Sequence, residues 1–337
     1  MFTLIIPAAL ISIVLWAIAA LRHVWHSIPR TNADFDLADL QAGDARMNVA
    51  NPAGAFYGTA IGPRLIGAAL RSVDRVAPEV GTRSALRVFF TPMPWKLSGR
   101  KHMPPRWNSE AWPFENASSL VAYRRRGVDS GLPTVLLVHG WAGNGAQLFR
   151  LGDALADAGY NPVLLDFPAH GRSGGWQSTL PQFQRAIYAA ASRIGPLHAV
   201  VAHSLGAIAA MHAVARGLPV DRLVLVAPSA PPVLFLRWFA GAFGLGESAA
   251  DRMIRHIEAR EAIRLSEFEP EWLGPRIHQR VLVIHDEGDR VAPLKVSKRV
   301  VMWLHHARLV TTQGLGHRRV LDDGRVADEI VAHLAPC

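Results

Sequence analysis

Short apolar runs alternate with longer amphipathic stretches through the part of the chain that follows residue 118. Several runs are almost continuously apolar, which is typical of strands covered on both faces of a parallel sheet. The stretches between them carry apolar residues at helical spacing. We therefore predict an α/β fold over 119–337, with a mostly parallel central sheet flanked by helices. The predicted strands are 120–124, 134–139, 162–166, 199–203, 222–227, 281–285 and 308–311. The predicted helices are 146–158, 180–194, 205–216, 294–304 and 326–334.

One interval between two predicted strands is much longer than a single crossover helix requires. It covers residues 228–279 and contains an apolar, aromatic stretch at 234–243. A second stretch, 249–264, alternates charged and apolar residues at helical spacing. We expect this insertion to be a helical lid.

The amino-terminal segment is apolar enough to enter a membrane. No charged side chain occurs over 2–21, and a helix of about 20 apolar residues crosses a bilayer. Positive charge follows the segment at Arg22 and Arg30, so the positive-inside rule places the rest of the chain in the cytoplasm. We expect a single-pass transmembrane helix with its flank over 1–30, in a bacterial inner membrane.

A cleaved secretory signal is the alternative reading of the same segment. Ala17 and Ala19 fit a cleavage site of small residues. However, the basic stretch that precedes the apolar core of a signal peptide is missing. The pattern therefore favours an uncleaved anchor.

Residues 31–118 are expected to form a connecting or accessory region. A helix is predicted over 63–76, whereas 87–113 is rich in proline, tryptophan and basic residues and predicts surface loops. Four basic side chains of these loops suit either plain solvent exposure or contact with anionic headgroups close to the anchor. They are Lys96, Arg100, Lys101 and Arg106.

Composition narrows the class of protein. Of 337 residues, 50% are hydrophobic and 19% charged, which is too apolar for a disordered chain. The net charge of +9 comes from scattered arginines that do not interleave with aromatic residues, so no nucleic-acid partner is expected. The single cysteine, Cys337, excludes an intramolecular disulfide and a cysteine metal site.

Ser204 lies between a predicted strand and a predicted helix, in the pentapeptide Ala-His-Ser-Leu-Gly. A serine at such a junction needs a sharp, strained turn that lifts its hydroxyl out of the sheet, and small residues at both ends let strand and helix approach. Ala202 stands where glycine is usual, and Gly206 fills the other small position. Taken alone, Ser204 fits a helix N-cap equally well. With its context, the motif predicts a nucleophile.

A second strand end supplies groups that complement the serine. Residues 135–138 lead into His139, Gly140 and Trp141. A turn there can direct the backbone N–H of Trp141 toward the point that the N–H of Leu205 faces, which would make an oxyanion hole. A simple strand-ending turn is the alternative for this segment.

The acid and the base of a triad should follow the nucleophile in that order. Asp289 lies just past the strand 281–285 and is the expected acid, with Asp286 as the other candidate. His317 lies in a glycine-rich loop after the strand 308–311 and is the expected base. A carboxylate at the ring nitrogen remote from the serine would hold the tautomer and stabilise the imidazolium.

With these residues assembled, the chain resembles the α/β-hydrolase superfamily, and among its members bacterial serine esterases and lysophospholipases. The segments that carry the resemblance are VLLVHGWAGNG, LLDFPAHGRSGG, VVAHSLGA, VLVIHDEGDRVAP and GLGHRRVL. The resemblance implies a structural role for His170 and Arg172 in the loop 166–174, which shapes the pocket beside the oxyanion turn. Serine at 204 separates the chain from relatives with an aspartate nucleophile, the dehalogenases and epoxide hydrolases.

The expected function is a membrane-anchored serine hydrolase of carboxylic esters, with small-molecule or lipid-derived esters as substrates. Neither a cofactor nor a metal is expected, because the chain has no H-E-x-x-H motif and no Walker loop. The same triad would serve an acyltransferase, a thioesterase or a peptidase. A non-catalytic membrane scaffold of the same fold is the alternative from another class.

Overall fold

The computed structural model describes residues 61–92, 103–115 and 118–335. The predicted anchor at 1–30 and the basic residues Lys96, Arg100 and Lys101 lie outside them. Among the described residues, none of the helices is both long and apolar enough to span a bilayer. The chain divides into two compact units. Of the described residues, one unit comprises 61–85 together with Leu236–Met253, and the other comprises the remainder.

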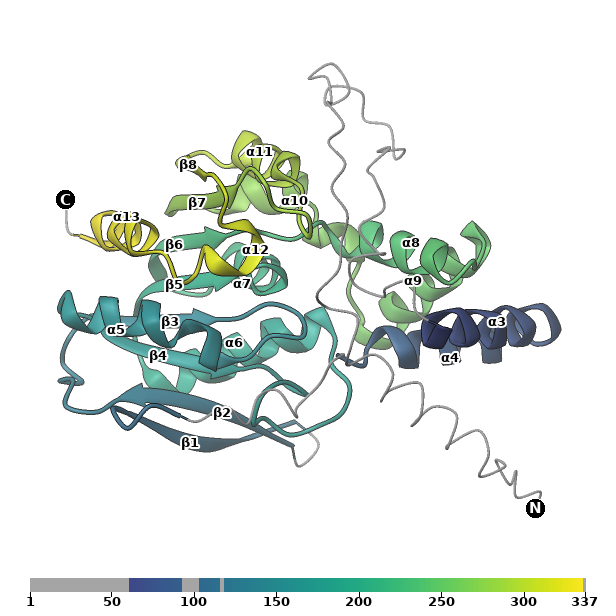
Figure 1. The fold of residues 1–337 in the computed structure, drawn as a ribbon, viewed down its shortest axis with the longest axis horizontal. Helices are drawn as coiled ribbons and strands as arrows, with labels where there is room; N and C mark the ends of the chain where they lie inside the picture. Colours follow the sequence, from purple (N-terminus) through teal and green to yellow (C-terminus); the bar gives the residue numbers. More distant parts are fainter. Residues whose placement is uncertain (1–60, 93–102, 116–117, 336–337) are drawn as a thin grey trace. The chain divides into compact units, whose positions relative to one another are not determined.

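The second unit is built on an eight-stranded sheet with the strand order β1-β2-β4-β3-β5-β6-β7-β8 (Figure 1). Strands β3 to β8 pair in parallel, while β1 pairs with β2 and β2 with β4 in antiparallel fashion. The strands are β1 (Trp107–Phe114), β2 (Ser118–Arg125), β3 (Thr134–Val138), β4 (Asn161–Asp166), β5 (Leu197–His203), β6 (Val220–Val226), β7 (Arg280–Asp286) and β8 (Ala307–Thr312). The predicted α/β-hydrolase fold, with a mostly parallel sheet flanked by helices, is confirmed.

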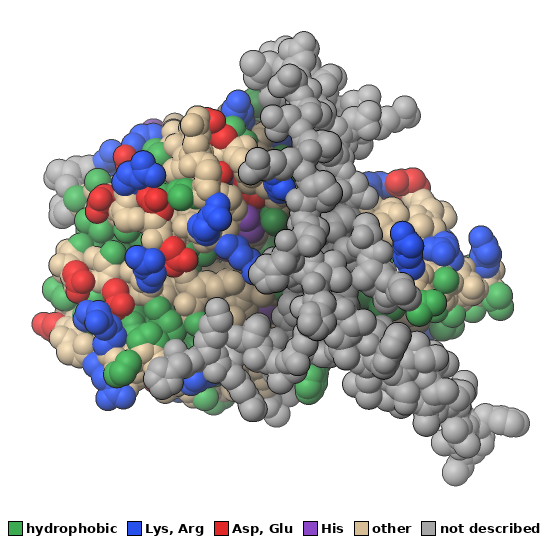
Figure 2. Space-filling model, viewed as in Figure 1, with side chains coloured by type: hydrophobic (Ala, Val, Ile, Leu, Met, Phe, Trp, Pro, Cys, Tyr) green, Lys and Arg blue, Asp and Glu red, His purple; other side chains and the backbone are tan. Residues whose placement is uncertain are grey.

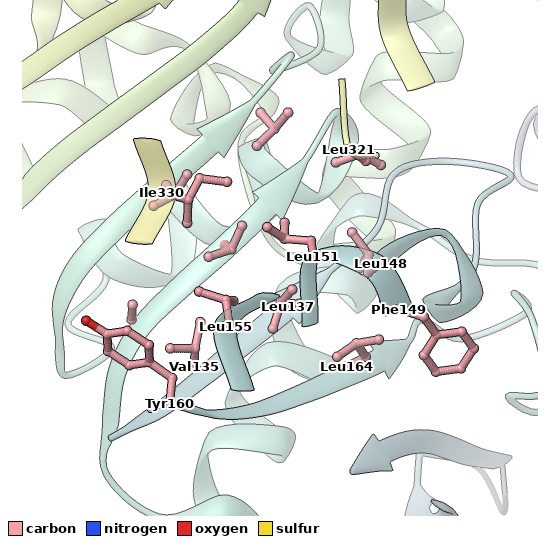
Figure 3. Close-up of a cluster of buried hydrophobic side chains, with 14 of the residues drawn as sticks. Val135, Leu137, Leu148, Phe149, Leu151, Leu155, Tyr160, Leu164, Leu321 and Ile330 are labelled. Atoms are coloured by element: carbon pink, nitrogen blue, oxygen red, sulfur yellow. The ribbon is translucent and has the colours of Figure 1, made fainter. Parts of the chain in front are cut away.

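The central strands are apolar along their whole length because both of their faces are covered. Every residue of β3 and of β4 is buried. Alternate strand residues, such as Val135 and Leu137, pack against α5 (Phe149–Asp157) and α13 (Gly324–Leu334) in a single cluster (Figure 3). The intervening strand residues are also buried, and α7 (Leu205–Ala215) contacts β5 and β6. Burial on this scale fixes the sheet on which the strand-end loops are mounted.

The helices of this unit agree with the predicted segments to within a few residues. They include α6 (Leu180–Ile194), which begins with a capping box of Thr179 and Gln182. The 3₁₀ turn η3 (Gly145–Leu148) precedes α5, and α11 (Leu294–Trp303) follows the loop after β7. Nearly all of α7 is buried, which explains why its sequence is apolar on every face.

The prediction of loops over 87–113 is wrong in part. Residues Trp107–Phe114 form β1, and α4 (Pro78–Phe89) extends to Phe89. A strand ending in Pro113-Phe114 is tolerated because β1 is the edge strand and pairs only with β2. Its two tryptophans are buried, and the four residues between them are exposed on both faces of the strand. Arg106 lies 3.7 Å from Asp153 in an ion pair, which gives this side chain a partner within the fold.

The predicted insertion 228–279 is helical. It contains α8 (Pro232–Ala242), α9 (Glu247–Glu261), η4 (Leu265–Phe268), α10 (Pro270–Leu273) and η5 (Gly274–Arg276). A part of it, Leu236–Met253, belongs to the first unit together with α3 (Ile61–Val76), which corresponds to the predicted helix 63–76. The role of this insertion as a lid stays a prediction.

Candidate active site

Ser204 occupies a strained turn between β5 and α7. Its backbone has φ 55° and ψ −121°, a conformation that L-residues rarely adopt. The turn is held by the Ser204 N–H, which donates to the carbonyl of Val226 at 2.9 Å. A Cβ atom at Gly206 would lie 2.3 Å from the His139 carbonyl oxygen, so glycine is required where α7 passes the end of β3. This close approach is what the small residue of the sequence motif provides.

His317 lies in the short helix α12 (Gly316–Arg319) and contacts both residues that the sequence paired with it. Its Nε2 is 3.0 Å from the hydroxyl oxygen of Ser204. Its Nδ1 is 2.6 Å from Oδ2 of Asp289. Asp289 lies 28 positions and Ser204 113 positions before His317 in the chain, and the three side chains are joined in one hydrogen-bonded series.

Asp289 is fully buried at its side chain and uses both oxygens. Oδ1 accepts the backbone N–H groups of Val291 and Ala292 at 2.8 and 2.9 Å. Oδ2 is therefore directed at His317, which donates its Nδ1 proton to it. This donor arrangement leaves Nε2 of the neutral imidazole as an acceptor for the Ser204 hydroxyl.

The turn after β3 lies directly against the serine. A Cβ atom at Gly140 would come within 2.6 Å of the Ser204 Cβ, so no larger residue fits there. Trp141 follows, and its N–H has no partner among the described residues. The N–H of Leu205, in the first turn of α7, lacks an intrahelical acceptor. These two N–H groups are the ones the sequence predicted for an oxyanion hole.

His170 fixes the same turn from the side. Its Nε2 accepts the N–H of Ala142 at 3.0 Å, and Ala142 has a positive φ of 54°. Its Nδ1 donates to the carbonyl of Pro168 at 2.8 Å, which sets the tautomer. Arg172 supports the loop 166–174 through its backbone N–H, which donates to Asp166 at 2.7 Å. Both residues that the resemblance assigned to this loop thus make contacts that shape it.

The loop that carries His317 is held by two further groups. His203 is buried, and its Nε2 lies 2.8 Å from the His317 carbonyl oxygen, to which it donates. Asp286, the other candidate acid, accepts the N–H of Leu315 and the hydroxyl of Thr312, each at 2.9 Å. Asp286 therefore contacts the loop backbone, whereas Asp289 contacts the imidazole.

Burial favours the neutral forms of His203 and His139. Desolvation, and then the neighbouring His317, lower the pKa of His203 well below its ordinary value. Desolvation lowers the pKa of His139 as well. Burial alone would raise the pKa of Asp286, but hydrogen bonds, chiefly from the N–H groups of Leu315 and Gly316, hold it below its ordinary value. A neutral His203 places no positive charge beside the ring of His317, which it contacts.

Within the described ranges, no group of three or more histidine, cysteine or acidic side chains is arranged to hold a metal ion. Around Ser204, the hydroxyl, an imidazole and a carboxylate are joined by hydrogen bonds, and the N–H groups of Trp141 and Leu205 belong to the two neighbouring turns. These are the parts that acyl transfer to a serine requires.

Comparison with known proteins addresses the fold. A family model described as the alpha/beta hydrolase fold matches residues 133–280. This match and the sheet topology agree in giving the chain the α/β-hydrolase fold. The match includes Ser204 and ends before Asp289 and His317. Comparison with curated protein sequences returns no significant match.

Several solved structures are similar to this chain at low sequence identity. Est1E from Butyrivibrio proteoclasticus, solved with bound ferulic acid, is 17% identical with a TM-score of 0.52 and covers 67% of this chain and 100% of its own. A thioesterase domain from the curacin biosynthetic pathway is 18% identical with a TM-score of 0.51, covering 68% and 98%. A membrane phospholipase A, a bacterial virulence factor, is 19% identical with a TM-score of 0.52, covering 84% and 93%. At these identities the similarity establishes the fold.

The structure brings together Ser204, His317 and Asp289 in hydrogen-bonded contact, while Trp141 follows Gly140, which lies against Ser204, and Leu205 follows Ser204 directly. Sequence reasoning did not assign Asp286 and His203 to the loop of His317. Their signal was present, because both immediately end strands at the same edge of the sheet. What they bind is backbone, which leaves no pattern in a single sequence.

Proposed function

We propose that the protein is a membrane-anchored serine hydrolase that cleaves carboxylic esters through an acyl-enzyme, with Ser204, His317 and Asp289 as its triad. The observation that carries this proposal is the hydrogen-bonded series from the Ser204 hydroxyl through His317 to Asp289. Packing of the sheet does not require a buried carboxylate, an imidazole and a strained serine in one line. Nucleophilic catalysis does.

In the first half of the reaction, the Ser204 oxygen attacks the acyl carbonyl carbon while its proton passes to Nε2 of His317. Negative charge develops on the carbonyl oxygen and is stabilised by the N–H groups of Trp141 and Leu205. Each such donor is worth about 3 kcal/mol in the transition state. The carboxylate of Asp289 stabilises the imidazolium.

The intermediate then collapses as His317 gives its proton to the leaving alkoxide oxygen, which departs as the alcohol. Water attacks the acyl-enzyme next, and His317 takes a proton from this water. Loss of the acid and return of the proton to Ser204 regenerate the enzyme. The two halves use the same groups in the same places.

Lipid-derived esters are the substrates we favour. The apolar, aromatic sequence of α8 suits a segment that lines an acyl-chain pocket. The structural neighbours include a protein named as a membrane phospholipase A, which supports the same class of substrate. The thioesterase neighbour keeps thioester cleavage as the alternative, because the same triad serves both reactions.

The membrane part of the proposal comes from the apolar segment at 2–21 and the arginines that follow it. We place the catalytic unit on the cytoplasmic side of a bacterial inner membrane. Protease added to intact spheroplasts should then leave the catalytic unit uncut. Digestion from outside would refute the orientation, and recovery of the protein free of membranes would refute the anchor.

A panel of nitrophenyl esters of increasing chain length, with a matching panel of thioesters and anilides, tests the reaction. We expect ester turnover that rises with chain length and that falls by orders of magnitude in Ser204→Ala with an unchanged melting temperature. Preference for two-carbon esters would contradict the lipid assignment. Equal turnover by parent and Ser204→Ala would refute Ser204 as the nucleophile, and no turnover of any ester, thioester or anilide by the parent would favour a non-catalytic scaffold.

A further inference from the structure

The helix α3 has two faces with different surroundings. One face packs within its own unit: Arg71 donates to the carbonyl of Phe243 at 2.8 Å, and Asp74 forms an ion pair of 2.5 Å with Arg252. A Cβ atom at Gly67 would lie only 3.1 Å from the same carbonyl oxygen of Phe243, so the helix approaches closely there. The opposite face is exposed. It consists of Arg64, Leu65, Ala68, Ala69, Ser72, Arg75 and Val76.

The exposed face is arranged as two parallel rows. Arg64 and Arg75 lie about three helical turns apart and so share one edge. Leu65 and Val76 have the same spacing and share the other edge, with Ala69 between them. Leu65 is 50% exposed and Val76 is 88% exposed, and Val80 at the start of α4 is 52% exposed. Figure 2 shows basic and hydrophobic side chains gathered next to one another over this helix.

Charge on this unit is unevenly neutralised. Arg252 pairs with Asp74, and Arg237 pairs with Glu247 and Asp251. In the part of the chain that the structure describes, no ion pair involves the exposed arginines of α3 and of the first two turns of α4. These are Arg64, Arg75 and Arg83.

We propose that the exposed face of α3, continued by the start of α4, docks onto an anionic phospholipid surface. A helix with arginines along one edge and aliphatic residues along the other is suited to lie in the interfacial plane of a bilayer. The aliphatic row enters the acyl boundary, and the arginine stems follow it while their guanidinium groups meet lipid phosphates. This extends the membrane association in the proposed function, but it requires neither the triad nor the anchor.

A second copy of the chain fits this face less well. A symmetric dimer would place arginine rows against each other or against aliphatic rows, because the same patch contributes on both sides. Among the described residues of α3 and α4, the only exposed acidic side chain is Glu79, at the start of α4. Charge complementarity therefore favours an anionic surface.

The test uses the full chain with Cys337→Ser, in which Val76→Cys carries an environment-sensitive nitrobenzoxadiazole label. The protein is reconstituted into nanodiscs, which expose both bilayer faces, made of phosphatidylcholine alone or mixed with phosphatidylglycerol. A chain that does not insert is instead mixed with preformed vesicles of the same lipids. We expect a blue shift and quenching by doxyl-labelled lipid with the anionic mixture. The matched label at Glu329→Cys, on α13, should stay aqueous.

Charge reversal at Arg64→Glu and Arg75→Glu should weaken docking by about tenfold or more, because each basic side chain near an anionic surface contributes measurably to binding. Raised salt should act in the same direction. Ester turnover on a water-soluble substrate serves as the fold control and should not change. Ser204→Ala should leave the label signal intact, so this inference and the proposed reaction fail separately.

Three results would overturn the proposal. The label could stay aqueous with anionic lipid. It could be shielded before lipid is added, which would show that the chain's own amino-terminal segment covers the face. A blue shift that grows with protein concentration and needs no lipid would indicate a second copy as the occupant.

Discussion

Replacing Asp289 with asparagine alters one atom of the side chain and reverses what that atom offers to His317. In the native protein Oδ1 accepts two backbone N–H groups and Oδ2 accepts the Nδ1 proton of His317. In Asp289→Asn the amide oxygen would keep the backbone contacts, so the NH₂ group would face Nδ1. The imidazole must then carry its proton on Nε2, where Ser204 needs an acceptor.

The expected consequence is a loss of about 10⁴-fold in kcat, the cost of the wrong tautomer in a Ser-His-Asp geometry. This corresponds to about 5.5 kcal/mol of transition-state stabilisation. The assay is steady-state turnover of a nitrophenyl ester, with the melting temperature measured to show that the fold persists. KM should change little because Asp289 is buried away from substrate.

Asp286→Asn is the matched control. Oδ2 of Asp286 accepts both the Leu315 N–H and the Thr312 hydroxyl, and Oδ1 accepts the Gly288 N–H. An amide nitrogen in either position therefore leaves a backbone N–H without its acceptor and does not touch the imidazole. We expect a lower melting temperature and a kcat loss of about tenfold, as for a small displacement of a positioned group. The reasoning is refuted if Asp289→Asn keeps parental activity, or if Asp286→Asn is the more damaging of the two.

Three other substitutions test the surrounding structure. His203→Leu leaves the His317 carbonyl without its donor, which costs about 1–3 kcal/mol of stability and should lower kcat more than it changes KM. His203→Gln restores a donor and should recover part of kcat. No recovery would exclude a positioning role for His203. Gly206→Ala places a Cβ 2.3 Å from the His139 carbonyl oxygen. It should destabilise the fold by about 1–3 kcal/mol and lower ester turnover about 10²-fold. A parental melting temperature and parental turnover would contradict the close approach of α7 to the end of β3. Burial, and then a nearby arginine, lower the pKa of His212 to about 4 from an ordinary 6.5, so its neutral form is favoured on folding and stability falls as the pH drops from 6.5 toward 4. Between pH 7 and pH 4.5, His212→Phe should remove about 2 kcal/mol of that loss. Urea unfolding of the parent and the variant at both pH values measures it, and an equal loss of stability in the two proteins would refute it.

The fold could be predicted from sequence because its central strands are buried on both faces. Such strands are apolar along their whole length, as in β3 and β4, and they stand out between amphipathic helices. The edge strand β1 does not stand out in the sequence, because only its two tryptophans are buried and it contains a proline. Its strand structure depends on pairing with β2, which local sequence does not reveal.

The candidate site, too, could be predicted from the sequence only in part. Ser204 and His317 follow strands at positions that a parallel sheet brings to one edge, so chain order and glycine placement were sufficient to predict them. Asp289 and Asp286 both lie at the carboxyl end of β7, and sequence spacing could only favour one. The orientation of the loop, set by the N–H groups of Val291 and Ala292, determines which carboxylate meets the imidazole.

The central claim is that the hydroxyl of Ser204 is activated by His317 and becomes acylated. Treating the full chain with a fluorophosphonate and mapping the adduct by peptide mass spectrometry tests it most directly. We predict one adduct, on Ser204, that forms far more slowly in His317→Ala at the same pH. An adduct on a different residue, or ester turnover in a protein whose Ser204 stays unmodified, would contradict the account.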